Sequence, residues 1–184
     1  MEETIKPIVI AIAAVSGGGK TATVNYLMEQ LPYTKALFFD DYDFTGPKDI
    51  ITWLNDGANY NDWDLSPFIY DLKRLQKEPL HYIILDYPFA YKNAQFRKLI
   101  DYAIFVDTPL DIALARRISR DFTDCSKSDI LIEINNYITQ GRRGYLEMLQ
   151  SVKPNSDFIV DGRLSISQIA KEIMRNVHRN ELHN

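Results

Sequence analysis

The chain has 184 residues, with 21 Lys and Arg side chains against 25 Asp and Glu, which gives a net charge of −4. Hydrophobic residues make up 46% and charged residues 25%, a balance typical of an ordinary globular domain. The small negative charge excludes the basic surface expected of a protein that binds nucleic acid or anionic membranes. The length suits one domain with its own core, and we expect a single domain across residues 1–184.

The N-terminal apolar run and the cysteine content both bear on the compartment. Residues 7–15 have the length of a signal-peptide core, but a glycine loop follows them in place of a small-residue cleavage site. The run is also too short to span a bilayer. Cys125 is the one cysteine of the sequence, so no internal disulfide can form, which fits a reducing compartment. We therefore expect a buried strand at residues 7–15 and a cytoplasmic protein.

Strand-like apolar runs alternate with segments of helical periodicity along the chain. In chain order we expect strand 7–14, helix 21–31, strand 35–40, helix 66–76, strand 81–86, strand 102–107, helix 108–122, helix 127–149 with a break near Gly141, strand 157–162 and helix 165–177. Ser66 and Thr108 are expected to cap two of these helices. This alternation predicts a parallel α/β sheet, in which ligands bind beyond the C-terminal ends of the strands. Asp40, Asp86 and Asp107 all fall at that edge.

The glycine loop lies between the first expected strand and the first expected helix. Residues 14–21 read A-V-S-G-G-G-K-T, which matches the phosphate-binding pattern G-x-x-x-x-G-K-[ST] except that Ala14 replaces the first glycine. In such a loop, backbone N–H groups surround an anion at a helix N-terminus, the lysine binds the outer phosphates and the hydroxyl suits Mg²⁺. The nucleotide-binding residues predicted in this way are Ser16, Gly17, Gly18, Gly19, Lys20, Thr21 and Ala22. The alternative, a glycine-rich turn with a chance Lys-Thr pair, does not explain the strand before and the helix after the loop.

Two acids at strand ends are candidates for catalysis and metal binding. Asp40, in the stretch FFDDYDF, is placed to take a proton from a substrate hydroxyl. Asp86, which ends the apolar run YIILD, is placed to hold Mg²⁺ through water. The alternatives are a solvated loop acid for Asp40 and a helix-capping aspartate for Asp86.

The stretch ARRISRD, residues 115–121, supplies candidate phosphate ligands. Helical spacing places Arg117 on the apolar side of its helix, where a guanidinium needs a partner such as phosphate or substrate. Arg120 lies one turn further on, and the sequence favours phosphate contact for both. For Arg116 it favours neither role. The alternative is a solvated basic face with ion pairs to Asp121 and Asp124.

Taken in order, these motifs resemble those of one enzyme family. SGGGKT, DDYDF, YNDWD, IILDYPFA, IFVDTPLDIALARRISRD and DFIVDG stand in the order and at the spacing found in the uridine kinase and nicotinamide riboside kinase group of P-loop kinases. The resemblance covers almost the whole chain. It implies an α/β fold of the P-loop NTPase type, a three-layer sandwich with a five-stranded parallel sheet, helices on both faces and a small lid at about residues 121–145.

The resemblance also implies residue roles near the acceptor. The first acid of the family's DD[FY] element, here Asp40, is the base that activates the acceptor, and Asp41 is its neighbour on the metal side. The element that grips a ribose corresponds to Trp63 and Asp64. Asp64 would then accept hydrogen bonds from sugar hydroxyls, and Trp63 would form a wall of the pocket. For Trp63 a place in the core is an equal alternative.

The remaining family residues concern the phosphates and the metal. The family's metal-side acid corresponds to Asp86, and the arginines of its RR and RD elements correspond to Arg117 and Arg120. With Lys20 and Thr21, these residues complete a set that can hold the phosphates of ATP beside Mg²⁺.

The sequence departs from the family pattern in its lid and glycine loop. Uridine kinases continue the RD element into an arginine-rich lid, whereas here Lys127 is the one cation of the stretch RDFTDCSKSD that follows Arg120. Arg142 and Arg143 can supply charge from the next helix, or lie in a solvated turn. These departures, with alanine at positions 14 and 22, leave the acceptor open.

From the sequence we therefore expect a Mg-ATP-dependent small-molecule kinase that acts on a hydroxyl of a nucleoside or nucleoside-like compound. The alternatives are a kinase for another small alcohol, such as a sugar or pantothenate, and a nucleotide-binding regulator with little transferase activity. The expected cofactors are ATP and Mg²⁺, and the expected partner is a small-molecule substrate, with no nucleic acid and no membrane. A homo-oligomer is left open.

Overall fold

The computed structural model describes residues 6–181, and its centre is a parallel sheet in the strand order β2-β3-β1-β4-β5. The strands are β1 (Ile8–Ala13), β2 (Thr34–Phe38), β3 (Tyr82–Asp86), β4 (Tyr102–Asp107) and β5 (Phe158–Asp161). All four strand pairings are parallel, so the C-terminal ends meet at one edge. The five-stranded parallel α/β fold expected from the sequence is thereby confirmed, with strand bounds shifted by at most two residues.

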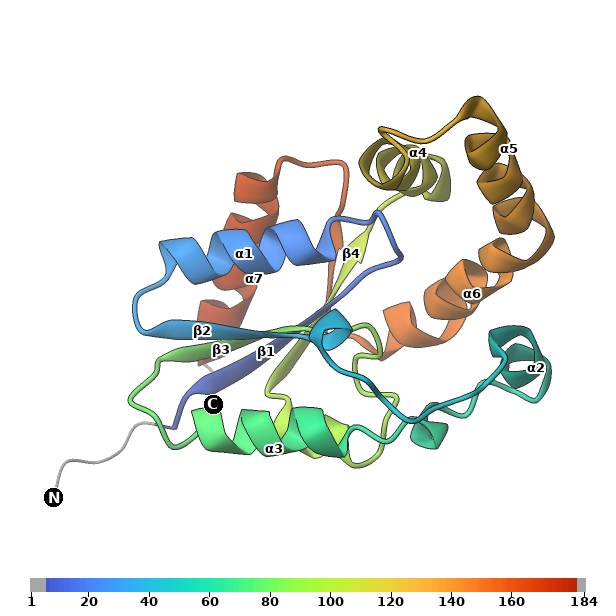
Figure 1. Cartoon of the computed structure of the whole chain (residues 1–184). Helices are drawn as coiled ribbons and strands as arrows, with labels where there is room; N and C mark the ends of the chain where they lie inside the picture. Colours follow the sequence, from blue (N-terminus) through green and yellow to red (C-terminus); the bar gives the residue numbers. More distant parts are fainter. Residues whose placement is uncertain (1–5, 182–184) are drawn as a thin grey trace, which may run out of the picture.

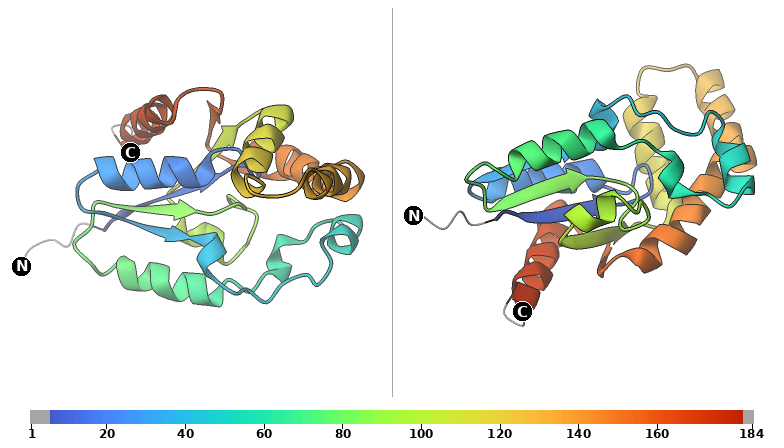
Figure 2. Two further views of the ribbon diagram at one scale, coloured as in Figure 1. Left: turned by 45° about the horizontal axis from the view of Figure 1, so that its top comes forward. Right: turned by 90° about the horizontal axis from the view of Figure 1, so that it is seen from below.

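Helices cover both faces of this sheet (Figures 1 and 2). The α-helices of the described residues are α1 (Lys20–Gln30), α2 (Ile50–Asn55), α3 (Ser66–Leu75), α4 (Leu110–Asp121), α5 (Lys127–Asn136), α6 (Arg142–Glu147) and α7 (Ile166–Glu181), of which α2, α5 and α6 lie beyond the edge of the sheet. In the central strand, Ile10 and Ile12 pack toward α1 and α7, while Val9 and Ala11 pack toward α3. This period of two is how a strand buried on both faces divides its side chains between two cores.

Residues 127–152 form a helical arm at the edge of the sheet where the strands end (Figure 1). Its helices α5 and α6 are joined by a π-helical turn, Tyr137–Gly141, and a second such turn, Met148–Val152, follows α6. We call residues 127–152 the α5–α6 arm. The break expected near Gly141 is replaced by this π turn, in which Gly141 keeps a helical φ of −60°. Widening of the helix is an established way to bend it without interrupting it.

The short helix α2 was not expected from the sequence, because six residues are too few to show a helical period. Asp49 caps it by accepting a hydrogen bond of 2.6 Å from the backbone N–H of Thr52. The guanidinium of Arg143, on the arm, donates to Asn55 at 2.5 Å. This bond ties the arm to α2, so the two elements face each other beyond the sheet edge (Figure 2).

The two helix caps expected from the sequence, Ser66 and Thr108, were wrong. Leu65 is the N-cap of α3, and Ser66 is already helical; its N–H and hydroxyl donate to the Asp64 carboxylate at 3.0 and 2.5 Å. Pro109 is the N-cap of α4. The hydroxyl of Thr108 instead donates to the carbonyl of Gly18, at 2.8 Å. Thr108 therefore anchors the glycine loop instead of its own helix.

Candidate functional site

The glycine loop has the backbone geometry that an anion site needs. Gly19 is the N-cap of α1 with φ of +96°, and no side chain caps this helix. The first N–H groups of α1 therefore remain available to a ligand, and the helix dipole adds positive potential there. Gly17 also has a positive φ, +78°. Ala14 does not, so alanine is compatible with the loop at the position where the family has glycine.

The loop is packed tightly against its neighbours. A Cβ on Gly17 would lie 2.0 Å from the carbonyl oxygen of Ala113 in α4. A Cβ on Gly162, in the turn after β5, would lie 1.8 Å from the hydroxyl of Thr108. Because α4 touches the loop at Ala113, the arginines one and two turns further along α4 begin beside the phosphate-binding backbone.

Lys20, Thr21 and Asp86 meet at the start of α1. Asp86 is buried at the end of β3, its carboxylate accepts a hydrogen bond of 2.6 Å from the Thr21 hydroxyl, and it forms an ion pair with Lys20. Burial lowers the pKa of Lys20 to about 8, and the negative charge of Asp40 opposes that shift. The Lys20 amine is thus mostly protonated at neutral pH, yet poorly hydrated, which favours an exchange of its contacts for phosphate oxygens.

Asp40 faces this group from the next strand. It follows β2 in a short 3₁₀ turn, Phe39–Asp41, two residues beyond Phe38, which pairs in register with Asp86. Its carboxylate is exposed and acts electrostatically on both Lys20 and Arg120. The parallel register is therefore what brings an acid from β2 opposite the phosphate-binding residues of α1.

These elements enclose a cleft of about 680 Å³, which we call the P-loop cleft. Its walls come from the glycine loop, the start of α1, the turn after β2, Pro88 beyond the end of β3, α4 and the α5–α6 arm. The lining residues are Ala14, Val15, Ser16, Gly17, Gly19, Lys20, Thr21, Ala22, Asn25, Phe39, Asp40, Pro88, Arg116, Arg120, Tyr145 and Met148. The structure thus brings together every predicted nucleotide-binding residue except Gly18, whose carbonyl is held by Thr108.

The arginines of α4 are arranged differently from the sequence prediction. Arg116 and Arg120 line the P-loop cleft, with Arg116 donating to the carbonyl of Gly162 at 3.1 Å and Arg120 bound to Asp121 at 2.5 and 2.9 Å. Arg117 does not line this cleft. It forms an ion pair with Glu133 of α5. Glu133 was not considered as a partner because sequence periodicity gives no information about contacts between two separate helices.

A second cavity lies on the other side of Arg117. It measures about 560 Å³ and is bounded by α2, α4 and the α5–α6 arm. We call it the arm cavity. Its lining residues are Lys48, Asp49, Ile50, Ile51, Leu54, Arg117, Glu133, Asn136, Tyr137, Gln140, Gly141, Gly144 and Tyr145. Tyr145 lines both this cavity and the P-loop cleft, so its side chain forms part of the boundary between them.

Trp63 and Asp64, expected to grip a ribose, line neither of these two spaces. The Trp63 ring packs between Phe39 and Phe89, with ring centroids 6.0 and 5.4 Å away, and against Gly46, where a Cβ would lie 2.8 Å from the indole. Asp64 holds the start of α3 through Ser66. Trp63 thus takes the packed position that the sequence left open as an alternative, and the ribose role of Asp64 stays a prediction.

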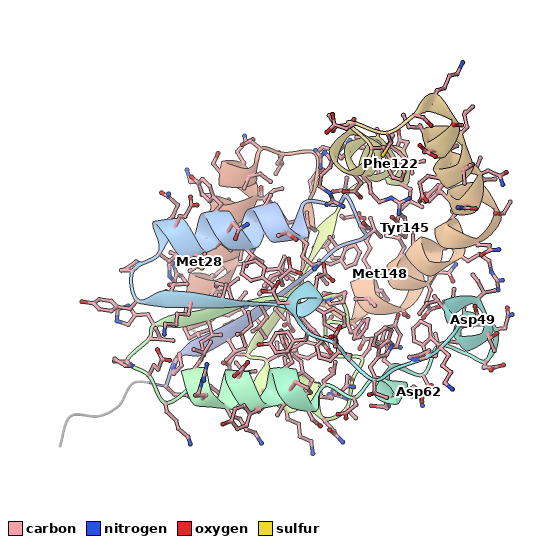
Figure 3. All side chains as sticks on the ribbon, viewed as in Figure 1. Met28, Asp49, Asp62, Phe122, Tyr145 and Met148 are labelled. Carbon is pink, nitrogen blue, oxygen red and sulfur yellow. The ribbon has the colours of Figure 1, made fainter. Side chains whose placement is uncertain are left out.

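Several lining residues were missed by sequence reasoning. Phe39 and Pro88 adjoin predicted acids, so their position follows from the strand ends. Tyr145 and Met148 come from the arm; in the sequence, Tyr145 and Leu146 indicate only that their helix packs against other elements. Figure 3 shows both on the side of the α5–α6 arm that faces the glycine loop. Lys127, Arg142 and Arg143, the other cations considered for this region, line neither space.

The residues present fit a magnesium ion. The Thr21 hydroxyl and the Asp86 carboxylate are hard oxygen ligands that already touch, and Mg²⁺ in phosphoryl-transfer sites takes one or two such ligands besides phosphates and water. In the described part of the chain, no group of three or more His, Cys, Asp and Glu residues forms a self-contained metal site. A metal held here would therefore need the phosphates of a nucleotide to complete its coordination.

Comparison with solved structures shows which known proteins share the fold. A gluconokinase from Sinorhizobium meliloti 1021 covers 97% of this chain and 97% of its own, with a TM-score of 0.58 and 18% identity. A shikimate kinase from Aquifex aeolicus covers 96% of this chain and all of its own, with a TM-score of 0.52 and 16% identity. At these identities the likeness concerns the fold, which is that of the P-loop kinases.

Comparison with known sequences finds similarity to uridine kinases. Uridine kinases of Macrococcus caseolyticus and Borrelia hermsii are 27% and 26% identical to the chain, over 84% and 83% of its length and 88% and 85% of their own. No family model matches the chain. The resemblance to uridine kinases seen in the motifs is confirmed. Together with the fold, this likeness supports an ATP-dependent phosphotransferase that acts on a small molecule.

The helices were also compared with the requirements of a bilayer. Within residues 6–181, none is both long enough and apolar enough to cross a membrane.

Proposed function

We propose that the chain transfers the γ-phosphoryl group of Mg-ATP to a hydroxyl group of a nucleoside or nucleoside-like acceptor. The observation that supports this most strongly is the convergence of Lys20, Thr21, Asp40 and Arg120 on one cleft, with Asp86 directly behind them. These residues supply a candidate for each element that phosphoryl transfer requires: a phosphate cradle, a metal-side carboxylate, an acceptor base and mobile positive charge.

In the proposed reaction, the acceptor oxygen attacks the γ-phosphorus and forms a new P–O bond. The bond from the γ-phosphorus to the β–γ bridging oxygen breaks, ADP leaves, and the proton of the acceptor hydroxyl passes to a carboxylate oxygen of Asp40. Lys20 exchanges its contact with Asp86 for the phosphate oxygens. Asp86 and Thr21 would hold the metal, which would neutralise charge on the phosphates.

Arg117 enters this proposal through the arm. Its Cβ lies near the glycine loop, 3.3 Å from where a Cβ of Gly17 would be, while its guanidinium pairs with Glu133. We propose that residues 121–145 act as a lid, and that Arg117 exchanges Glu133 for phosphate when the lid closes. Closure would exclude water from the P-loop cleft and so limit hydrolysis of ATP.

The acceptor is proposed to occupy the arm cavity. That space adjoins the P-loop cleft at Tyr145 and carries both donors and acceptors, among them Asn136, Gln140 and Lys48. One observation favours the second candidate, a kinase for a non-nucleoside alcohol: the Asp64 carboxylate is engaged with Ser66 instead of facing the cavity. Acceptor screening separates the two candidates.

The test is ADP release from Mg-ATP with a panel of nucleosides, nicotinamide riboside, sugars and pantothenate. With the acceptor so identified, we expect Asp40→Asn to lower kcat by about 100- to 10,000-fold, the usual contribution of a general base, with ATP affinity retained. Asp43→Asn is the matched control, since Asp43 is an exposed acid of the same stretch that does not line the cleft.

Near-wild-type turnover of Asp40→Asn would contradict the assignment of Asp40 as the base. Tight ATP binding by the wild-type protein, without stimulation by any acceptor, would contradict the kinase proposal and favour a nucleotide-binding regulator.

A further inference from the structure

The hydroxyl of Tyr145 is buried without a hydrogen-bond partner in the described structure. Two other tyrosine hydroxyls have partners: Tyr60 bonds Ser151 at 3.2 Å and Tyr91 bonds Asp157 at 2.6 Å, whereas the Tyr87 hydroxyl, in the core, has none among the described residues. Leaving a polar group of this kind unpaired costs free energy, unless a ligand supplies the missing partner. Tyr145 therefore marks a place where a polar ligand atom would be stabilised.

The residue that carries this unpaired hydroxyl lies between two cavities. The side chain lines both the P-loop cleft and the arm cavity. On the side of the P-loop cleft, Tyr145 is close enough to Arg120 to interact with it electrostatically, as Asp40 also does. On the side of the arm cavity, its ring packs against Tyr137, with centroids 5.3 Å apart at an angle of 64°. Figure 3 shows Tyr145 reaching inward from α6 toward the glycine loop.

A second buried donor without a partner among the described residues belongs to another residue that lines the arm cavity. The Nε of Arg117 is buried and has no partner, although its terminal nitrogen pairs with Glu133, and Arg117 also lines the arm cavity. Two buried donors without partners around one cavity indicate a ligand that brings hydrogen-bond acceptors to it. A purely apolar alcohol would leave both donors unpaired.

We propose that Tyr145 is a specificity-determining residue whose hydroxyl donates a hydrogen bond to a second oxygen of the acceptor, near the oxygen that is phosphorylated. This rests on the proposed function. A substrate that presents one hydroxyl to Asp40 and extends into the arm cavity must pass Tyr145. The favoured acceptors are thus compounds in which the reacting hydroxyl has another oxygen close by, as in a furanose ring or a polyol.

The first measurement is Tyr145→Phe, which removes the hydroxyl and keeps the ring. We expect kcat/KM for the acceptor to fall by about 5- to 100-fold, the loss that follows from one buried hydrogen bond, while KM for ATP stays within about twofold of wild type. The melting temperature of the ligand-free variant should stay unchanged or rise, because the mutation removes an unpaired polar atom.

Tyr87→Phe is the matched control. The Tyr87 hydroxyl is also buried without a partner, but Tyr87 lies in the core and lines neither cavity. Both substitutions remove a buried hydroxyl that has no hydrogen-bond partner in the described part of the structure. We expect Tyr87→Phe to leave the acceptor kinetics unchanged, so that only the variant at the cavity boundary loses acceptor specificity.

The second measurement pairs each protein with acceptor analogues that lack one oxygen. If Tyr145 binds an oxygen near the reacting hydroxyl, one analogue should react poorly with the wild type and show no further loss with Tyr145→Phe. Unchanged acceptor kinetics in Tyr145→Phe, or a lowered melting temperature as the sole effect, would overturn the proposal. So would full additivity of the two losses for every analogue.

Failure of the proposed function looks different. If the wild type releases no ADP with any compound of the panel, the kinase proposal fails, and thermal stabilisation by the same compounds becomes the readout. A compound that stabilises the wild type more than Tyr145→Phe then still supports a Tyr145 contact. Equal stabilisation of the two proteins, or none, overturns it.

Discussion

A Cβ added at Gly17 should destabilise the folded protein in two ways that can be measured separately. Its φ of +78° is a left-handed backbone, which costs a residue other than glycine about 1–2 kcal/mol. The added atom would also lie 2.0 Å from the Ala113 carbonyl oxygen, a backbone atom that cannot rotate away. Forced overpacking adds about 1–3 kcal/mol. We therefore expect Gly17→Ala to lower the free energy of unfolding by about 2–5 kcal/mol.

Gly57→Ala isolates the first effect. Gly57 has a φ of +94°, and a Cβ added there would have no neighbouring atom within 4 Å. This variant should lose only the backbone term, about 1–2 kcal/mol. Urea unfolding of both variants, with similar m-values, gives the difference that belongs to the contact with α4. Gly17→Ala should also lower kcat/KM for ATP, because relief of the overlap moves α4 and its arginines from the loop. Equal losses of stability in the two variants would refute the packing argument.

Two further predictions concern titration and capping. Because the pKa of Lys20 is lowered to about 8, kcat/KM for ATP should fall as pH rises through that value, and Lys20→Arg should lack this alkaline limb. Between about pH 8 and the ordinary lysine pKa of 10.5, Lys20 binds more protons in the unfolded state than in the folded state. The contribution of Lys20 to the free energy of unfolding should therefore increase with pH across that window. A free energy of unfolding whose pH dependence is the same in the wild type and in Lys20→Arg would contradict this prediction. Hydrogen bonds from Ser66 lower the pKa of Asp64, so Asp64→Ala should lower the melting temperature at neutral pH, with the difference lost as pH falls through the lowered pKa, and should leave KM for the acceptor unchanged. A higher acceptor KM without a change in melting temperature would instead support the ribose role.

Much of the functional edge could be predicted because it depends on local sequence. A strand followed by glycines and then a helix is a local pattern, and it located Lys20 and Thr21 without any knowledge of distant contacts. Asp86 and Asp40 could be added because parallel strands end at a common edge, a rule that needs only the strand order of the chain. The structure brings these residues into one cleft.

The prediction was less successful where side chains choose between partners in separate elements. Helical spacing placed Arg117 on the buried side of α4, and a phosphate was the expected partner. The partner in the structure is Glu133, sixteen residues further along the chain on another helix. Likewise, the family pattern assigned Asp64 to a sugar, whereas in the structure its carboxylate accepts hydrogen bonds from Ser66, the first residue of α3.

The sequence by itself determined the parallel α/β fold, the glycine loop and the acids at the strand ends, because these follow from periodicity, backbone conformation and chain order. Only the tertiary structure decided which arginines reach the P-loop cleft, that Thr108 holds the loop, and that Tyr145 separates two spaces. These facts depend on how α4 and the α5–α6 arm lie relative to each other. That geometry is set by packing between residues far apart in the sequence, and no local pattern encodes it.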